Sequence, residues 1–351
     1  MPRIFDSPSA FFDHGFDTVI DVRSPAEFAE DHVPGAINLP ALSNEERAEV
    51  GTMYTQVSPF LARKLGASLV LRNVADHIAG PLKDYDGSWQ PLVYCWRGGQ
   101  RSGVFTTILK EIGWRADTVK GGYQSYRKLV QTYLYDGSLP HNLILLDGYT
   151  GTAKTALLPR LAARGVQTID LEGLAGHRGS LLGAMPGGQP AQRGFETALV
   201  QRLLALDPDK PTIVEAESSK IGQINLPPAL WARMVAAPRI DLTAPLSARV
   251  TYIADDYADI LRDPATVRDR LSPLRRIRGH KTVDHWQTLQ DARDFTGLAA
   301  ALMRDHYDKS YAKSRRLNDR AILGSVHADT LNDSGLNMAA DAIAKLVRNA
   351  L

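Results

Sequence analysis

The chain has 351 residues, of which 44% are apolar and 23% are charged, a balance typical of a folded globular protein. The formal net charge is +2, so any contact with nucleic acid must depend on a local basic patch. A single cysteine, Cys95, excludes an internal disulfide and argues against a cysteine-ligated zinc site. The N-terminus lacks the pattern of a signal peptide, and no apolar run approaches the ~20 residues of a membrane span. A cytoplasmic protein with no membrane partner is therefore expected.

Residues 1–136 are expected to form a first α/β domain. Short apolar runs at 18–22, 36–40, 91–95 and 116–120 predict strands, and helical segments separate them. Such alternation favours a parallel sheet with helices on its faces. The turn-rich stretch 135–140 predicts the domain boundary.

Residues 137–351 are expected to form a second α/β domain with helices at its C-terminal end. Strands are predicted at 142–147, 166–170, 212–215 and 239–243, and a helix at 155–164. In the last segment, 336–351, helical spacing predicts one apolar face formed by Met338, Ala342, Leu346 and Val347.

The first candidate site surrounds Cys95, where a strand ends in a glycine-containing loop. The sequence there is Cys95-Trp96-Arg97-Gly98-Gly99-Gln100-Arg101-Ser102, and Ser102 is expected to cap a helix that begins at Gly103. Backbone N–H groups at a helix N-terminus can form a cradle for an anion. The same field, with Arg97 and Arg101, would lower the thiol pKa and favour the nucleophilic thiolate.

Two other interpretations of this loop remain open. Cys95 can be a buried apolar residue at a strand end, with two solvated arginines beside it. The spacing of cysteine, five residues and arginine, from Cys95 to Arg101, is also that of a cysteine phosphatase.

The second candidate site is a phosphate-binding loop between a predicted strand and a predicted helix. Its residues are Gly148-Tyr149-Thr150-Gly151-Thr152-Ala153-Lys154-Thr155. Glycines let the backbone close around phosphate oxygens, Lys154 supplies positive charge, and the Thr155 hydroxyl can bind Mg²⁺. Ala153 stands where the motif has its second glycine, so its methyl group is expected to hinder a nucleoside triphosphate or to shift the diphosphate. A glycine- and threonine-rich turn without a ligand is the alternative.

Glu215 and Glu217 follow the predicted strand 212–215 and are candidate partners for the Mg²⁺. Carboxylates at strand ends are also common as solvated groups, so this assignment depends on the loop.

A basic segment in the second domain is the candidate RNA-binding surface. Its cationic residues, with an aromatic neighbour for base stacking, are Arg268, Arg270, Arg275, Arg276, Arg278, Lys281 and Trp286. Lys309, Lys313, Arg315 and Arg316 form a second cluster near Tyr307 and Tyr311. A solvated basic face explains either cluster equally well.

The ordered set of motifs resembles a family. The segments 21–28 and 32–40, the Cys95 loop and the Gly121-Gly122-Tyr123 turn are similar to a rhodanese domain. That domain joined to a P-loop domain, with the segments 44–52, 170–180 and 214–218, resembles the tRNA 2-selenouridine synthases. The Cys95 loop is one residue longer than the usual rhodanese loop, which suits a larger anion such as selenophosphate.

The resemblance implies a transferase that acts on tRNA carrying wobble 2-thiouridine, in the lysine, glutamate and glutamine acceptors. Geranyl diphosphate would first alkylate the sulfur, and selenophosphate would then replace the thioether, leaving 2-selenouridine. The P-loop residues, with Arg178, would hold the diphosphate; the Cys95 loop, including Gly98, Gly99, Gln100 and Ser102, would handle selenium. Mg²⁺ and a selenophosphate supplier are implied, and no tightly bound organic cofactor. His177 is either catalytic or a loop histidine bonded to the backbone.

Three other functions remain open for the chain. A P-loop kinase or NTPase with a rhodanese-like regulatory domain would hydrolyse ATP or transfer phosphate, and it would not need Cys95. A cysteine phosphatase would depend on Cys95. A tRNA-binding scaffold would need neither Cys95 nor Lys154 for turnover.

Overall fold

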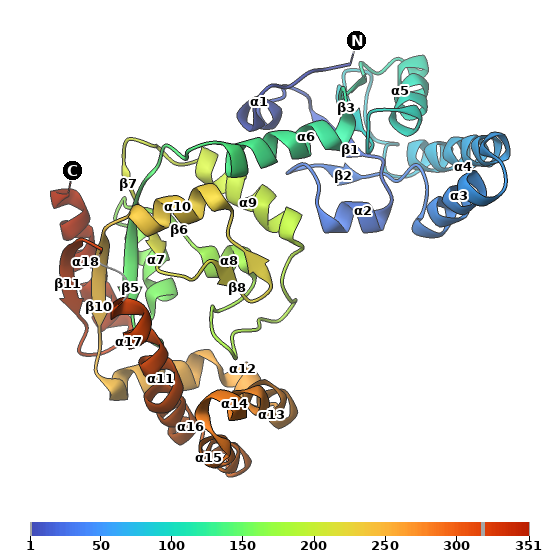
Figure 1. Ribbon diagram of the computed structural model, residues 1–351. Coiled ribbons are helices and arrows are strands. Elements are labelled where there is room, and N and C mark those ends of the chain that lie inside the picture. Colours follow the sequence, from blue (N-terminus) through green and yellow to red (C-terminus); the bar gives the residue numbers. More distant parts are fainter. Residues whose placement is uncertain (1, 317–319, 351) are drawn as a thin grey trace. The chain divides into compact units, whose positions relative to one another are not determined.

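The computed structural model describes residues 2–316 and 320–350, apart from the side chains of Leu261 and residues 313–316. It divides the chain into two compact units (Figure 1). The first contains residues 1–138 and 190–204, and the second contains residues 139–189 and 205–351. Among the described helices, none is long and apolar enough to cross a membrane.

The first unit is built on a four-stranded parallel sheet with the strand order β2-β1-β3-β4. The strands are β1 (Thr18–Asp21), β2 (Ile37–Asn38), β3 (Pro91–Tyr94) and β4 (Asp117–Thr118). Its helices are α1 (Pro8–Phe12), α2 (Pro25–Glu30), α3 (Asn44–Gln56), α4 (Pro59–Ala79), α5 (Gln100–Ile112), α6 (Gly122–Gln131), the π-helix η1 (Thr132–Asp136) and α9 (Gln192–Leu204). The parallel sheet confirms the expected α/β class of this region.

Serine residues set where several of these helices begin. Ser43 starts α3, because its hydroxyl accepts the Glu46 N–H and the Glu46 carboxylate accepts the Ser43 N–H. This reciprocal pair satisfies two backbone donors that a helix end leaves unpaired. Ser58 caps α4 in a similar way and is followed by Pro59, which suits the first helical turn. The long helices α3 and α4 therefore meet at a short, sharply defined turn.

Helix α9 belongs to the first unit, although the sequence predicts it within the second domain. Its Glu196 is buried, forms an ion pair with Arg127 of α6 and accepts a 2.6 Å hydrogen bond from the Tyr135 hydroxyl. Arg193 forms a 3.0 Å ion pair with Glu30. The boundary near residue 138 is thus close to the expected one, but a later segment of the chain completes the first unit.

The second unit contains a five-stranded parallel sheet with the order β11-β10-β5-β7-β6. Its strands are β5 (Asn142–Gly148), β6 (Gln167–Ile169), β7 (Pro211–Glu215), β10 (Arg239–Thr243) and β11 (Ile322–His327), and a small antiparallel pair is formed by β8 (Lys220–Ile221) and β9 (Ile224–Asn225). The helices around the sheet are α7 (Lys154–Ala162), α8 (Leu171–Ala175), α10 (Pro228–Ala236) and α18 (Asp333–Asn349). Strand β11 is an addition to the predicted set.

Helix α18 packs on α7 and β11 through a different face from the predicted one. Met338 is 71% exposed and Ala342 is exposed, whereas Leu336, Ile343 and Val347 are buried. The buried set also includes three alanines, whose small size lets the helix approach its neighbours closely. The predicted face is therefore wrong at Met338 and Ala342, whereas Val347 is buried and Leu346 packs against the core as expected.

A helical region between β10 and β11 has its own hydrophobic core. Its elements are α11 (Leu246–Asp256), α12 (Ala258–Leu261), α13 (Pro264–Leu271), η2 (Ser272–Leu274), α14 (Arg275–Arg278), α15 (His280–Asp291), α16 (Phe295–Leu302), the π-helix η3 (Met303–Tyr307) and α17 (Asp308–Arg316). The core includes Val267, Leu271, Val283, Trp286 and Leu298. This region is drawn in orange to red below the sheet in Figure 1.

Candidate functional site

The thiol of Cys95 lies at the carboxyl end of β3, where the chain turns into α5. Its side chain is 4% exposed and belongs to the core of the first unit. The Gly99 N–H donates to Sγ at 3.3 Å, and the Ser102 hydroxyl donates to it at 3.2 Å. Helix α5 begins at Gln100, earlier than expected, so Ser102 lies within its first turn instead of preceding it. The helix N-terminus therefore faces the sulfur.

These donors shift the ionisation of the thiol. Burial raises the pKa of Cys95. The hydrogen bonds from Ser102 and Gly99 and the charge of Arg101 together lower the pKa by more than burial raises it, so it lies below its ordinary value. A lower pKa increases the thiolate fraction, which is the nucleophilic form. Arg97 and Gln100 are exposed on the same loop.

Two glycines let the following turn pack directly against the thiol loop. A Cβ on Gly122 would clash with the Cys95 carbonyl oxygen, and one on Gly98 would lie 2.6 Å from the Val119 carbonyl oxygen. The N–H of Tyr123 donates to the Cys95 carbonyl at 2.8 Å. The start of α6 thus fixes the backbone of the loop, which explains why the Gly121-Gly122-Tyr123 turn accompanies the cysteine.

Charged residues of the segment 21–28 form ion pairs next to the thiol loop. Asp21 and Arg23 form a fully buried ion pair at 2.6 Å, and the Arg23 guanidinium lies 3.9 Å from the centre of the Tyr123 ring. Glu27 accepts from Arg101 at 3.2 Å and from Arg47 at 2.7 Å. Burial raises the pKa of Glu27, but the charge of Arg101 and the contacts with Arg47 lower it below its ordinary value. Glu27 therefore stays ionised and holds Arg101 beside the thiol.

The phosphate loop lies between β5 and α7 in the second unit. Lys154 begins α7, and its ammonium donates to the Gly148 carbonyl at 3.1 Å. The Thr152 hydroxyl donates to the Tyr149 carbonyl at 2.8 Å, closing the turn. Gly148 has no room for a side chain, because a Cβ there would lie 2.7 Å from both the Leu242 carbonyl oxygen and Thr152. This strand–loop–helix geometry is the one that the P-loop motif requires.

Ala153 adopts a left-handed backbone, with φ of 61° and ψ of 34°. Its side chain is 3% exposed and packs in the core cluster with Leu157 and Leu158. A left-handed backbone costs a residue with a Cβ about 1–2 kcal/mol, so the methyl group strains the loop. The effect of this methyl group on ligand choice stays a prediction.

Two carboxylates contact the Thr155 hydroxyl, and a third, Glu217, lies against one of them, Glu172. Thr155 donates to Glu172 at 2.9 Å and is in hydrogen-bond contact with Glu215. Burial, and then repulsion from Glu217, raises the pKa of Glu172 to about 8. Burial, and then repulsion from Glu172, raises the pKa of Glu215 to about 8. Burial likewise raises the pKa of Glu217 to about 6, despite the charge of Lys154.

Glu172 joins this cluster although no sequence motif indicates it beyond its place in the segment 170–180. Glu172 comes three positions after the end of β6, in the first turn of α8. An acidic residue in a first helical turn is common, so this position alone is a weak indication of a ligand site. Crowded carboxylates beside a hydroxyl are a suitable environment for a hard divalent cation. The described residues contain no ready-made cluster of three histidine, cysteine or acidic side chains with metal-ligand geometry. A cation here would therefore need oxygen atoms from a bound phosphate as well.

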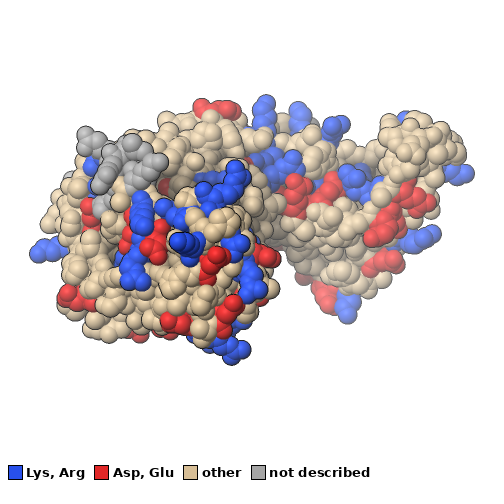
Figure 2. Space-filling model, turned by 60° about the horizontal axis from the view of Figure 1, so that its bottom comes forward, with Lys and Arg blue, Asp and Glu red and all other residues tan. Residues whose placement is uncertain are grey.

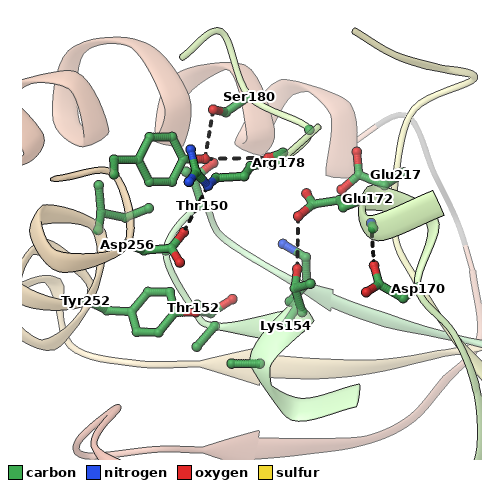
Figure 3. Close-up of a pocket in the computed structure, with 18 of the residues that line it drawn as sticks. Thr150, Thr152, Lys154, Asp170, Glu172, Arg178, Ser180, Glu217, Tyr252 and Asp256 are labelled. Atoms are coloured by element: carbon green, nitrogen blue, oxygen red, sulfur yellow. Dashed lines mark hydrogen bonds and ion pairs between the residues drawn. The ribbon is translucent and has the colours of Figure 1, made fainter. Parts of the chain in front are cut away.

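A pocket of about 390 Å³ opens over the loop. Figure 3 shows Lys154, Glu172 and Arg178 pointing into it. Arg178 donates to Asp259 at 3.1 Å, and its guanidinium lies 5.1 Å from the centre of the Tyr257 ring. Besides the loop itself, the walls include residues that no sequence pattern indicates: Met185, Tyr252, Ile253, Asp256, Tyr257 and Tyr307. These residues lie far from the loop in sequence, so no local pattern connects them to it.

His177 lies outside the lining of this pocket. It is buried, and its Nδ1 has no hydrogen-bond partner among the described residues. Burial, together with the charges of Arg270 and Arg178, lowers its pKa. The residue is therefore neutral near pH 7 and packs behind the segment that carries Arg178.

The basic segment is exposed, but its aromatic member is not. Trp286 is fully buried in the core of the helical region, so the expected stacking of Trp286 on an RNA base is wrong. Helix α15 turns the tryptophan inward because position 286 lies on the same face as Val283 and Gln290. Arg270, Arg276 and Lys281 are exposed.

Several of the arginines are held by neighbouring side chains. Arg268 pairs with Asp291 at 2.8 Å, Arg275 pairs with Asp284 at 2.5 Å, and Arg278 donates to Ser310 at 2.6 Å. Figure 2 shows a face on which lysine and arginine side chains gather with acidic side chains between them. The side chains of Lys313, Arg315 and Arg316, from the second expected cluster, lie outside the described residues.

The fold and both loops define the class of protein: a rhodanese-like unit combined with a P-loop unit. Residues 9–129 match the family model of the rhodanese-like domain, and residues 141–272 match that of the "tRNA 2-selenouridine synthase AAA domain". The fold class expected from the sequence is thereby confirmed.

Relatives identify the particular family. The chain is 37% identical to a tRNA 2-selenouridine synthase of Bdellovibrio bacteriovorus over 68% of this chain and 64% of that protein. It is 33% identical to that of Chromohalobacter salexigens over 84% of this chain and 86% of the relative. A Nitrosomonas europaea relative of the same name is 35% identical over 73% of this chain and 68% of that relative. The matched part thus spans slightly less than two thirds of the Bdellovibrio protein. The chain belongs to the tRNA 2-selenouridine synthase family.

Proposed function

We propose that the chain converts wobble 2-thiouridine in tRNA to 2-selenouridine in two steps, one at each loop. The relatives carry the name of this activity. One observation supports assigning one step to each loop: the two sites differ, since hydrogen-bond donors surround the thiol and carboxylates lie at the P-loop.

In the first step, the 2-thiouridine sulfur attacks the C1 carbon of geranyl diphosphate. A carbon–sulfur bond forms, the carbon–oxygen bond to diphosphate breaks, and N3 of the base loses its proton. Lys154, the loop N–H groups and Arg178 would stabilise the charge that develops on the departing diphosphate. The aromatic rings of Tyr252 and Tyr257 in the pocket wall offer apolar surface for the geranyl chain.

Magnesium ion is the cofactor that the phosphate site would use. Thr155, Glu215 and Glu217, joined by Glu172, are the residues that would hold it, since all four gather at the start of α7. When bound, the ion would neutralise diphosphate oxygens. Lys154 and Arg178, which line the same pocket, would bind the same diphosphate.

In the second step, selenophosphate replaces the geranylated sulfur. Its selenium attacks C2 of the base, the carbon–selenium bond forms, and the carbon–sulfur bond breaks to release geranylthiol. Water then cleaves the selenium–phosphorus bond and releases phosphate. Donors at the N-terminus of α5, with Arg101, would hold the anionic selenium donor next to Cys95. The supplier would be an enzyme that makes selenophosphate.

The decisive experiment is mass spectrometry of nucleosides from 2-thiouridine tRNA incubated with the protein, Mg²⁺, geranyl diphosphate and selenophosphate. Geranylated 2-thiouridine should appear first and 2-selenouridine afterwards. The lysine, glutamate and glutamine acceptors are the tRNAs to use. If neither product forms while ATP is hydrolysed in a parallel reaction, the kinase or NTPase function replaces this proposal.

A further inference from the structure

An apolar pocket in the first unit lies beside the thiol loop, between α3, α4 and α5. It has a volume of about 1010 Å³, at the upper end of the range of small-molecule sites. Apolar side chains from all three helices line it, including Val50, Val70, Val104 and Ile108. Gln100 and Arg101, which belong to the thiol loop, form part of the same lining. A ligand in this pocket would therefore reach the region of Cys95.

Each of the three helices contributes a glycine to the pocket wall. They are Gly51 in α3, Gly66 in α4 and Gly103 in α5. Glycine inside a helix is less favourable than alanine, so its position needs another reason. A Cβ on Gly51 or Gly103 would meet nothing within 4 Å. At Gly51 and Gly103 the missing side chains thus keep the pocket open, whereas Gly66 lies against Val50 of α3.

The wall of the pocket leaves apolar surface in contact with water. Every residue of α3 is described, and none is fully buried. Tyr54 is 48% exposed and Leu71 is 52% exposed, and both line the pocket. Because removing apolar surface from water is favourable, an apolar occupant would stabilise this helical pair.

The charges at the pocket indicate what the occupant is attached to. Arg47, Arg63 and Arg101 are among the described lining residues, which include no carboxylate. Glu27 pairs with both Arg47 and Arg101, so one carboxylate faces two guanidinium groups. An apolar interior with a positively charged edge suits an apolar chain that is carried by a polyanion.

We infer that this pocket binds the geranyl chain of S-geranyl-2-thiouridine in tRNA during the selenium step. This inference rests on the proposed function and assigns a substrate group to the thiol unit. With the chain held between α3, α4 and α5, C2 of the base would lie at the thiol loop, and the arginines would face the RNA backbone. The same contacts would retain geranylthiol after it leaves, until the products dissociate.

The test is a comparison of two anticodon stem-loop RNAs that differ only in S-geranyl-2-thiouridine or 2-thiouridine. The full-length protein should bind the geranylated RNA at least about tenfold more tightly, since burial of a few carbons suffices for that factor. Gly51→Leu places a side chain in the pocket, and the preference should fall to about twofold or less. Gly103→Leu fills the pocket from another helix and should act in the same way.

Matched controls separate filling of the pocket from damage to the helix. Thr52→Leu adds a leucine at the next position of α3, which is exposed and outside the pocket lining, and should keep the full preference. Gly51→Ala adds a single methyl group, and this variant should keep most of the preference for the geranylated RNA. Far-ultraviolet circular dichroism confirms folding, and if one leucine variant does not fold, the other decides.

The outcomes distinguish this inference from the proposed function. If the unmodified protein converts geranylated RNA with selenophosphate but both leucine variants keep their preference, the pocket assignment fails alone. If the leucine variants lose affinity for free geranyl diphosphate and not for the RNA, the pocket serves the donor and the inference is overturned. If the unmodified protein converts neither RNA, the proposed function fails as well.

Discussion

The thiol loop and the phosphate loop both lie where a strand of a parallel sheet runs into a helix, yet their charges are arranged in opposite ways. Around Cys95, two acidic groups each pair with an arginine: Glu27 with Arg101, and Asp21 with Arg23. Around Thr155, three carboxylates crowd together and their pKa values rise. The charges at the thiol loop are paired, whereas the acidic groups at the phosphate loop repel one another.

This difference teaches that the two loops depend on different things. The thiol loop is positioned by backbone packing, through Gly98 and Gly122, and by short hydrogen bonds to sulfur. At the phosphate loop the acidic groups raise one another's pKa, and we expect a bound cation to relieve that repulsion. Variants, pH and Mg²⁺ should therefore affect the two units separately.

The largest effect is expected for Lys154→Ala. The lysine charge is the main cation at the phosphate loop, so its removal should slow geranyl transfer at least about 100-fold. Product formation is measured by mass spectrometry of nucleosides. In a second reaction that starts from geranylated tRNA, the variant should still incorporate selenium. Geranyl transfer at the unmodified rate would remove the P-loop from the first step.

Cys95→Ser should produce the opposite pattern. Geranylation should continue, and selenium incorporation should fall at least about tenfold, since serine disturbs the contacts of Gly99 and Ser102 with sulfur in the loop that would hold the selenium donor. The geranylated tRNA should therefore accumulate. If both steps survive the substitution, Cys95 has no chemical role and the loop serves only to bind the selenium donor.

Charge reversal in the helical region should affect RNA binding in both steps. Arg270→Glu with Arg276→Glu changes two exposed arginines and should weaken tRNA affinity about tenfold at low salt. The slope of log K against log salt should become shallower, by about one for each phosphate that is no longer neutralised. The control is Arg268→Glu, because Arg268 is already paired with Asp291. An unchanged slope would move the RNA surface elsewhere.

A smaller effect is expected from pH and Mg²⁺ on stability. The folded-state pKa of Glu215 is raised to about 8, so its contribution to stability is fully present below the unfolded pKa and is lost as pH rises through about 8. Without Mg²⁺, the free energy of unfolding should therefore fall as the pH rises from 5.5 to 8.5. In the presence of Mg²⁺, this decrease in the free energy of unfolding should be smaller.

Glu215→Gln is the matched variant for this measurement. The neutral amide has no proton to lose, so the pH dependence and the response to Mg²⁺ should both become weaker. Chemical unfolding at several pH values gives the free energies. A Glu215→Gln protein with the full response to Mg²⁺ would contradict the assignment of the cation to this carboxylate.

The smallest effect is expected for Ala153→Gly. Glycine relieves the left-handed backbone strain, but it removes a buried methyl group and makes the unfolded chain more flexible. These terms oppose each other, so stability should change by less than about 1 kcal/mol. Urea unfolding measures the change. A decrease well above this value would mean that the methyl group supports the loop more than its backbone strains it.

Local features of the chain are predictable from the sequence. The strand before Cys95, the turn after it and the strand–loop–helix around Lys154 each depend on neighbouring residues, so the periodicity and the glycines indicate them. The Thr155–Glu215 contact is predictable too, because carboxyl ends of parallel strands meet at one edge of a sheet.

The features that sequence patterns miss depend on residues far apart in the chain. The charged neighbours of Trp286 suggest that it is available for stacking, but α15 turns it into a core formed with other helices. The spacing around Met338 predicts the wrong face, because the alanines of α18 form much of the real contact surface. Glu172 and the tyrosines of the phosphate pocket are brought together by tertiary packing alone.

The position of α9 has a consequence for the synthesis of the protein. The ribosome completes residues 1–138 well before it reaches Glu196, the buried partner of Arg127. Until then the nascent first unit lacks the buried carboxylate that pairs with Arg127 and the hydroxyl that contacts Tyr126. The unit is therefore completed by a segment that emerges more than fifty residues later, and a fragment cut at residue 138 would lack that segment permanently.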